Sequence, residues 1–264
     1  VVAGVESAAG EARFVVIGID RPTADGNAKV AAIEAGQSPI RSPDAELDRL
    51  TRVGARERGN LRATTDARAF GLADIVIVDV GLDVVELGRE NLRIDEAGFA
   101  AAIRAIGRHM RADALVILES TVPVGTCEHV VAPLLAEERG RRGIVEPAAL
   151  AHAYERVTPG PRYVDSIRNF HRVFAGTSPD AAARARAFLS AVVDTEAFPL
   201  AELADTPSSE MAKLLENSYR AVNIAFIHEW TLMAERVGVD LFAVIDAIRR
   251  RRGTHDNIRQ PGFG

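Results

Sequence analysis

Three polar side chains that could stabilise a negative charge lie close together in a stretch predicted to be helical. Lys213, Asn217 and Arg220 are spaced by four and three residues, so they share one face of a helix. A cation, an amide and a guanidinium side by side suit an oxyanion or a phosphate. An ordinary solvated helix face is the commoner meaning of such a pattern, but the apolar residues around it predict a helix packed on much of its circumference. We therefore treat these three residues as candidate site residues.

A second set of candidates follows predicted strands. Asp20 closes the apolar run 14–20, where an acid can accept hydrogen bonds from the ribose hydroxyls of a dinucleotide; a helix cap or a turn residue is the alternative. The segment 120–126 places hydroxyl groups, Thr121 among them, at the carboxyl end of the run 114–119 and beside a predicted helix start. Open α/β sheets bind their ligands at this edge, although capping of the helix is the alternative.

A third set lies in the loop 154–160, which proline and glycine bound. This loop supplies Glu155 and Arg156, for which a salt bridge within the loop is the alternative. The histidines of the chain are scattered without the spacing of metal ligands, so no metal site is expected.

The glycine-rich loop that would bind a dinucleotide's pyrophosphate is not found before Asp20. Gly4 and Gly10 do not form the G-x-G-x-x-G pattern, and no predicted strand precedes them. Residues 1–7 stand where the helix after such a loop would lie. Either the site is not a dinucleotide site, or the loop lies upstream of Val1.

The elements that must position these residues alternate between strands and helices. This order predicts an α/β fold with a parallel sheet, which ends near Pro199 and is followed by a purely helical region. We place the boundary between 203 and 204, giving a Rossmann-like domain 1–203 and a helical domain 204–264. The predicted strands are 14–20, 73–80, 114–119, 172–176 and 195–200, and the predicted helices are 95–111, 126–139, 180–193, 209–237 and 241–252.

Composition narrows the classes of function. The chain has 264 residues, 47% of them hydrophobic, and a formal net charge of -5, which argues against nucleic acid or an anionic membrane as partner and favours a small molecule. Its single cysteine, Cys127, excludes an internal disulfide and a zinc site built on cysteine pairs. No apolar run reaches the roughly 18 residues of a membrane span, so a cytoplasmic chain is expected. The ends, Val1 and Gly264, suggest that the sequence is incomplete.

Taken together, the motifs resemble the UDP-glucose/GDP-mannose dehydrogenase family, and in particular its UDP-N-acetylmannosamine dehydrogenase-like branch. The resemblance runs in order through Gly-Ile-Asp at 18–20, 61–66, Ser-Thr-Val-Pro-Val-Gly at 120–125, Tyr-Glu-Arg-Val-Thr-Pro-Gly at 154–160, Lys-Leu-Leu-Glu-Asn at 213–217 and Pro-Gly-Phe-Gly at 261–264.

The resemblance implies a Rossmann domain, a central helical domain that forms a homodimer, and a C-terminal nucleotide-binding domain that is absent from these residues. It implies NAD as cofactor and a nucleotide-sugar substrate, with a UDP-N-acetylhexosamine favoured, in polysaccharide biosynthesis. The implied reaction oxidises the C6 alcohol to the uronic acid by two hydride transfers through a cysteine thiohemiacetal and thioester. The family's catalytic cysteine would follow Gly264, so Cys127 does not match it and is interpreted as a small packed residue.

The same resemblance implies roles for individual residues. The cofactor would be held by Asp20, Arg21 and Thr121, and Thr121 would also hold a catalytic water. The sequence departs from the family's pattern at two places near these contacts. The family's Val-Pro-Thr-Pro motif is here Val-Gly-Leu-Asp at 80–83, and the stretch 21–26 after Asp20 is longer than in the family. The catalytic residues implied are Lys213, Asn217, Glu155 and Thr121, and the substrate contacts implied are Arg156, Val157, Lys213, Asn217, Arg220 and His255.

Two other interpretations stay open. A β-hydroxyacid dehydrogenase of the 6-phosphogluconate type also pairs a Rossmann domain with a helical one and uses a lysine and an asparagine one helical turn apart. A non-catalytic dimerisation module is a different class of function, and the long apolar stripe of 209–237 predicts a dimer under either interpretation.

Overall fold

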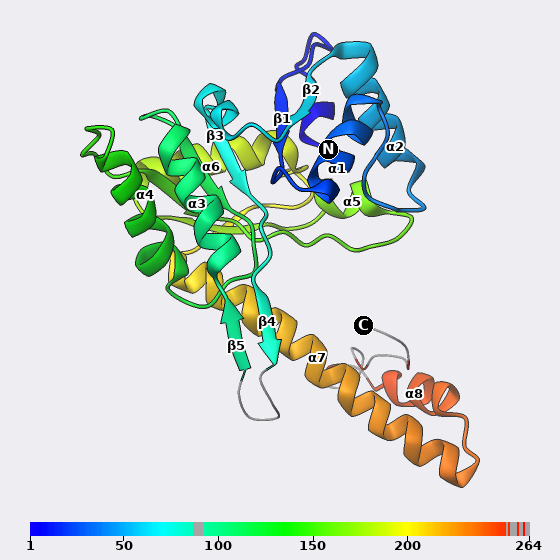
Figure 1. The fold of residues 1–264 in the computed structure, drawn as a ribbon. Helices are drawn as coiled ribbons and strands as arrows, with labels where there is room; N and C mark the ends of the chain where they lie inside the picture. Colours follow the sequence, from blue (N-terminus) through cyan, green and yellow to red (C-terminus); the bar gives the residue numbers. More distant parts are fainter. Residues whose placement is uncertain (87–91, 252, 254–257, 259–260, 262–264) are drawn as a thin grey trace. The chain divides into compact units, whose positions relative to one another are not determined.

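The computed structural model describes residues 1–86, 92–251, 253, 258 and 261 (Figure 1). The chain packs as two units, Val1–Glu210 and Met211–Gly264, and each is described by itself. The first unit is an α/β structure and the second is helical, as the sequence predicts. The boundary predicted between 203 and 204 stays a prediction, because the two units meet inside a continuous helix.

The first unit is built on a five-stranded sheet. Its strand order is β3-β6-β7-β8-β9, with parallel pairs throughout except for the antiparallel pair β7 and β8. All four residues of β6 are buried, which requires helices on both faces of the sheet. The strands are β3 (Ile75–Val78), β6 (Leu115–Leu118), β7 (Ala149–His152), β8 (Val173–Gly176) and β9 (Ala201–Glu202).

Alternate residues of β6 serve two different cores, because successive side chains of a strand point to opposite faces. Val116 and Leu118 belong to a cluster with residues of α3 (Ala97–His109) and α4 (Ala132–Gly140). Leu115 and Ile117 belong to a second cluster with residues of α6 (Pro179–Val192). The sheet is therefore the middle layer of three, as Figure 1 shows for α3 and α6.

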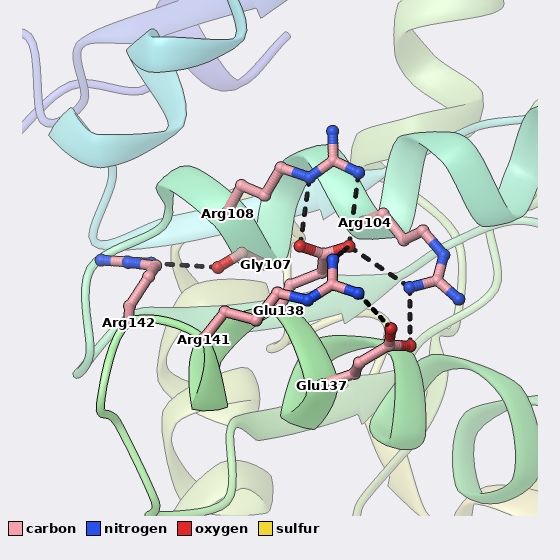
Figure 2. A network of polar contacts seen from close by, with 7 residues as sticks. All are labelled: Arg104, Gly107, Arg108, Glu137, Glu138, Arg141 and Arg142. Carbon is pink, nitrogen blue, oxygen red and sulfur yellow. Dashed lines mark hydrogen bonds and ion pairs between the residues drawn. The ribbon is translucent and has the colours of Figure 1, made fainter.

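Polar contacts add to the packing of α3 on α4 (Figure 2). The Glu138 carboxylate is 1% exposed and accepts hydrogen bonds from Arg104, Arg108 and Arg141, at 3.2, 3.1 and 2.9 Å respectively. Arg142 Nη1 donates to the carbonyl oxygen of Gly107 at 3.0 Å. These contacts join one carboxylate of α4 to two arginines of α3, so they fix how the two helices lie against each other.

A second, two-stranded parallel sheet precedes the first in the chain. β1 (Val16–Ile19) pairs with β2 (Leu61–Thr64), and α1 (Ala24–Glu34) and α2 (Ala45–Arg52) lie between them in sequence. Neither strand is hydrogen-bonded to the five-stranded sheet among the described residues. The strand predicted at 14–20 is thus confirmed, while its partner β2 was not predicted as a strand.

The remaining short elements of the first unit complete the connections. The chain begins with a single 3-10 turn, so the helix that the spacing placed at 1–7 does not form. The short elements are η1 (Val2–Gly4), the π-helical η2 (Val53–Arg58), η3 (Ala67–Leu72), the antiparallel pair β4 (Asp83–Glu86) and β5 (Leu92–Asp95), the π-helical η4 (Cys127–Val131) and α5 (Tyr163–Arg168).

Two predicted boundaries are wrong. The strand predicted at 195–200 is a turn, with the Phe198 N–H donating to the Asp194 carbonyl, and pairing begins only at Ala201. Pro199 explains this shift, since it has no N–H to donate to a neighbouring strand. The helix predicted to end at 252 ends at Arg249.

The second unit continues α7 (Thr206–Val237), which confirms the long helix predicted at 209–237, and adds α8 (Leu241–Arg249). Ile227, Ala234, Leu241 and Ile245 form a small buried core of this unit. Gly238 has a φ of 69°, a left-handed conformation that glycine adopts without strain, and it ends α7. Across the part of the chain that the structure describes, every helix is too short or too polar to span a membrane.

Candidate active site

The carboxyl ends of β3, β6 and β7 bring together a cluster of charged residues. Arg172, which precedes β8 and is almost fully buried, donates from Nη2 to the Glu119 carboxylate at the end of β6. Ser120 follows Glu119 and donates from Oγ to the Val80 carbonyl at 2.6 Å, which ties the end of β6 to the chain leaving β3. This edge of the sheet is where the sequence predicts the ligand.

Three carboxylates of this cluster, those of Asp79, Glu119 and Glu155, lie close enough to affect one another's charge. Burial raises the pKa of Glu119, and the charges of Asp79 and Glu155 raise it further, while Arg172 opposes them. Burial and the charge of Glu155 also raise the pKa of Asp79. The pKa of Tyr163 is raised by burial and by the same two carboxylates. The carboxyl groups of Glu119 and Asp79 therefore retain a proton more readily than isolated carboxyl groups, which suits acid–base chemistry.

The loop that carries Glu155 is held by its own side chains. The Val157 N–H donates to the Glu155 carboxylate, which curls the loop back on itself. Arg156 donates to the His171 carbonyl at 3.0 Å and to the Tyr154 hydroxyl at 3.1 Å, and its guanidinium lies 5.4 Å from the centre of the Tyr154 ring. Arg156 thus fastens the loop to the residues before β8.

The segment after β6 contains the predicted site residue Thr121 and ends at a helix. Thr121 is exposed, whereas Gly125 and Cys127 are buried. Gly125 has a φ of 88°, the left-handed region that favours glycine. The N–H groups of Gly125 and Cys127 both donate to the Glu210 carboxylate, at 2.5 and 2.8 Å. Glu210, from the first turns of α7, therefore caps the helix that follows this segment.

Cys127 is fully buried, as predicted for a packed residue. Burial raises the pKa of its thiol far above the usual value, and the charge of Glu210 adds to this effect. The thiolate is the nucleophilic form, so Cys127 is not suited to covalent catalysis.

Asp20 lies directly after β1 with a side chain that is 34% exposed. One carboxylate oxygen accepts the Arg21 N–H at 2.7 Å, and the other lies 3.3 Å from Lys29 Nζ. Lys29 also pairs with Asp25 at 2.7 Å. A half-buried carboxylate at a strand end fits the ribose hydroxyls of a dinucleotide, and Arg21 is exposed.

The three candidates on α7 differ in their surroundings. Lys213 is buried with 6% of its surface exposed, Asn217 is half-buried and Arg220 is exposed. Arg220 Nη2 donates to Asn217 Oδ1 at 3.0 Å, which confirms that these two side chains lie on the same face of the helix. His255 lies outside the described residues.

The structure brings Glu155 close enough to Glu119 and Asp79 for their charges to interact, which the sequence did not predict. Glu119, Asp79, Arg172 and Glu210 were all missed as site residues. Glu119 and Asp79 stand at the ends of predicted strands, the same signal that identified Asp20. Among the described residues, no group of histidines, cysteines and carboxylates could hold a metal ion.

Comparison with known proteins gives the family. Residues 3–192 match the NAD binding domain of the UDP-glucose/GDP-mannose dehydrogenase family, and residues 207–264 match the central domain of the same family. The chain belongs to this family. The match confirms the predicted resemblance, the fold class and NAD as the cofactor of the first domain.

Family members of two kinds are similar over most of the chain. The NDP-N-acetyl-D-galactosaminuronic acid dehydrogenase of Ralstonia nicotianae is 32% identical over 240 residues, covering 89% of this chain and 53% of that protein. The UDP-N-acetyl-D-mannosamine dehydrogenase of Yersinia pestis is 33% identical over 241 residues, with the same coverage of 89% and 53%. The solved UDP-D-ManNAc dehydrogenase of Pyrococcus horikoshii has 29% identity and a TM-score of 0.78, covering 96% of this chain and 55% of that one. The chain thus spans about half the length of these relatives.

Proposed function

We propose that this protein oxidises the C6 hydroxyl of a UDP-N-acetylhexosamine to the carboxylate, with NAD⁺ as the oxidant. The observation that carries the proposal is the match of two consecutive domains to one dehydrogenase family, at 32–33% identity to enzymes named for N-acetyl-D-galactosaminuronic acid and UDP-N-acetyl-D-mannosamine. The clustered carboxylates at the edge of the sheet support it, because alcohol oxidation needs a group that accepts the hydroxyl proton.

NAD⁺ would be held by residues at the carboxyl ends of β1 and β6. The half-buried carboxylate of Asp20 fits the adenosine ribose hydroxyls, with the backbone of Arg21 beside it. Thr121 offers an exposed hydroxyl after β6. When bound, NAD⁺ supplies the acceptor for the hydride that leaves C6 of the sugar.

The residues of this chain would handle the charge and the proton. Lys213 and Asn217 stabilise the negative charge that grows on the C6 oxygen as its proton leaves. Glu155, or a water held by Thr121, accepts that proton as general base. Arg156, Val157, Arg220 and His255 contact the substrate.

A complete oxidation to the carboxylate passes through an aldehyde, and the family resemblance implies that a cysteine captures it. Cys127 does not take that role, because its thiol is buried and its pKa is raised. We propose that α7 forms the homodimer, since its exposed apolar side chains make one continuous stripe. The cytoplasmic location stays a prediction.

The test is an NADH assay on the protein expressed from its complete reading frame. The substrates are UDP-N-acetylhexosamines, UDP-glucose, GDP-mannose and 6-phosphogluconate. The expected result is two NADH released per UDP-N-acetylhexosamine consumed. One NADH per 6-phosphogluconate, with none from any nucleotide sugar, would instead support the β-hydroxyacid class, and no turnover or NAD⁺ binding at all would support a non-catalytic module.

A further inference from the structure

We propose that Glu210 is a positioning residue that ties the first turns of α7 to the loop after β6 and thereby sets where Lys213 and Asn217 stand for catalysis. The proposal rests on the proposed function, since it concerns the same site. It assigns to Glu210 no contact with substrate or cofactor.

The Glu210 carboxylate has no exposed surface, which for a charged group is costly unless it is fully compensated. Its compensation comes from the backbone. Oε2 accepts the Gly125 N–H at 2.5 Å and Oε1 accepts the Cys127 N–H at 2.8 Å. The Cys127 N–H belongs to the first residue of η4 and the Gly125 N–H to the turn just before it, where unpaired donors and the helix dipole favour a negative charge. A carboxylate in this position makes two bonds that no neutral side chain of the same shape can make together.

The loop that receives Glu210 has a fixed conformation. Gly125 adopts a φ of 88°, and a Cβ built on it would come within 2.9 Å of the His129 ring. Thr126 Oγ1 donates to the Pro123 carbonyl at 2.7 Å and closes the turn. The two N–H groups therefore point at one place in space, and Glu210 occupies it.

The residue before Glu210 is also fixed. Ser209 is fully buried, and its Oγ shares a hydrogen bond of 2.8 Å with Nδ1 of His152 at the end of β7. Two consecutive side chains thus hold the first turns of α7 at the carboxyl ends of β6 and β7. Because a helix is a rigid element that rises 1.5 Å per residue, any shift or rotation of these turns is passed on to residues that follow. Lys213 is three residues beyond Glu210, on the same face.

The test compares Glu210→Gln with a control, Glu235→Gln, which removes an exposed carboxylate of the same helix. In Glu210→Gln an amide NH₂ faces one of the two N–H groups, so one hydrogen bond becomes a contact between donors. We expect kcat to fall about 10- to 100-fold, because misplacement of about 1 Å can cost that much. KM for NAD⁺ should stay within about threefold, and the control should match the wild type. Circular dichroism and Tm establish that the compared proteins are folded.

A double-mutant cycle with Lys213→Ala separates positioning from a general loss of structure. If Glu210 acts through the placement of Lys213, Glu210→Gln lowers kcat much less in the Lys213→Ala background than in the wild type. Equal losses in both backgrounds, or a folded Glu210→Gln enzyme with kcat within threefold of the wild type, would overturn the proposal.

Should Glu210→Gln not fold, Glu210→Asp is measured in the same cycle. It keeps the charge but is one methylene shorter, so it draws the helix and the loop together and is expected to lower kcat in a folded protein. A folded Glu210→Asp enzyme with wild-type kcat would overturn the proposal. A wild-type protein without dehydrogenase activity would contradict the proposed function instead, before any variant is compared.

Discussion

At the scale of single residues, Lys213 is the strongest candidate for charge stabilisation because it is a buried cation. Replacing it by alanine removes the positive charge that would face the developing oxyanion. We expect Lys213→Ala to lower kcat by about 10²-fold or more in the NADH assay, the usual effect of losing one oxyanion donor. Arg236→Ala, which removes an exposed cation of the same helix, serves as control. A Lys213→Ala enzyme with kcat within about threefold of the wild type would exclude this role.

Glu138 makes a residue-scale prediction about pH. Its contacts with Arg108, Arg104 and Arg141 lower the pKa of Glu138 from 4.5 to about 2. Because the folded pKa lies below the unfolded one, the stabilisation is present above about pH 4.5 and is lost as pH falls towards 2. Glu138→Gln should therefore have a lower Tm than the wild type at pH 7. The difference in Tm between the two proteins should become smaller as the pH falls towards 2. The curves of Tm against pH test this, with the exposed Glu196→Gln as control; parallel curves for Glu138→Gln and the wild type would contradict it.

At the scale of elements, the close approach of α3 and α4 depends on a glycine. A Cβ on Gly107 would lie 2.9 Å from Glu138 Cβ and 3.5 Å from Leu135 Cα, so Gly107→Ala should separate the two helices and destabilise the protein by about 1–3 kcal/mol. Gly98, in the same helix, has nothing within 4 Å of its Cβ position. Gly98→Ala should instead stabilise the helix by about 0.5–1 kcal/mol. Urea unfolding measures the change in the free energy of unfolding for both variants. A change of the same sign in both would refute the packing argument.

At the scale of the whole molecule, the exposed side of α7 predicts self-association. Its exposed apolar side chains follow a helical spacing, and Val222 is 68% exposed. A second copy of the chain would cover this stripe. We expect Val222→Arg combined with Phe226→Arg to shift the protein towards monomer in light scattering coupled to gel filtration. Val145→Arg changes an isolated apolar residue that is 85% exposed, and it should leave the mass unchanged. A wild-type monomer would contradict the prediction.

Much of the fold could be predicted from local patterns. The apolar runs at 73–80 and 114–119 predict the buried strands β3 and β6, and the stripe at 209–237 predicts α7, because burial and periodicity are properties of neighbouring residues in the chain. The motifs at Asp20, 120–126 and 154–160 likewise predict the family from residue type and order alone. The strand predicted at 195–200 was placed wrongly, because Pro199 has no N–H to donate and strand pairing begins only at β9.

What the tertiary structure alone decided is which distant groups meet. Arg172 pairs with Glu119 across 53 positions, and Glu210 reaches Gly125 across 85. A sequence states that each of these residues is charged, but the free energy of burying a charge depends on the partner that the fold brings to it. The sequence by itself therefore determined the elements, the family and the candidate chemistry. The packing of the sheet and its helices determined which carboxylates share a proton-retaining site and which one holds α7 in place.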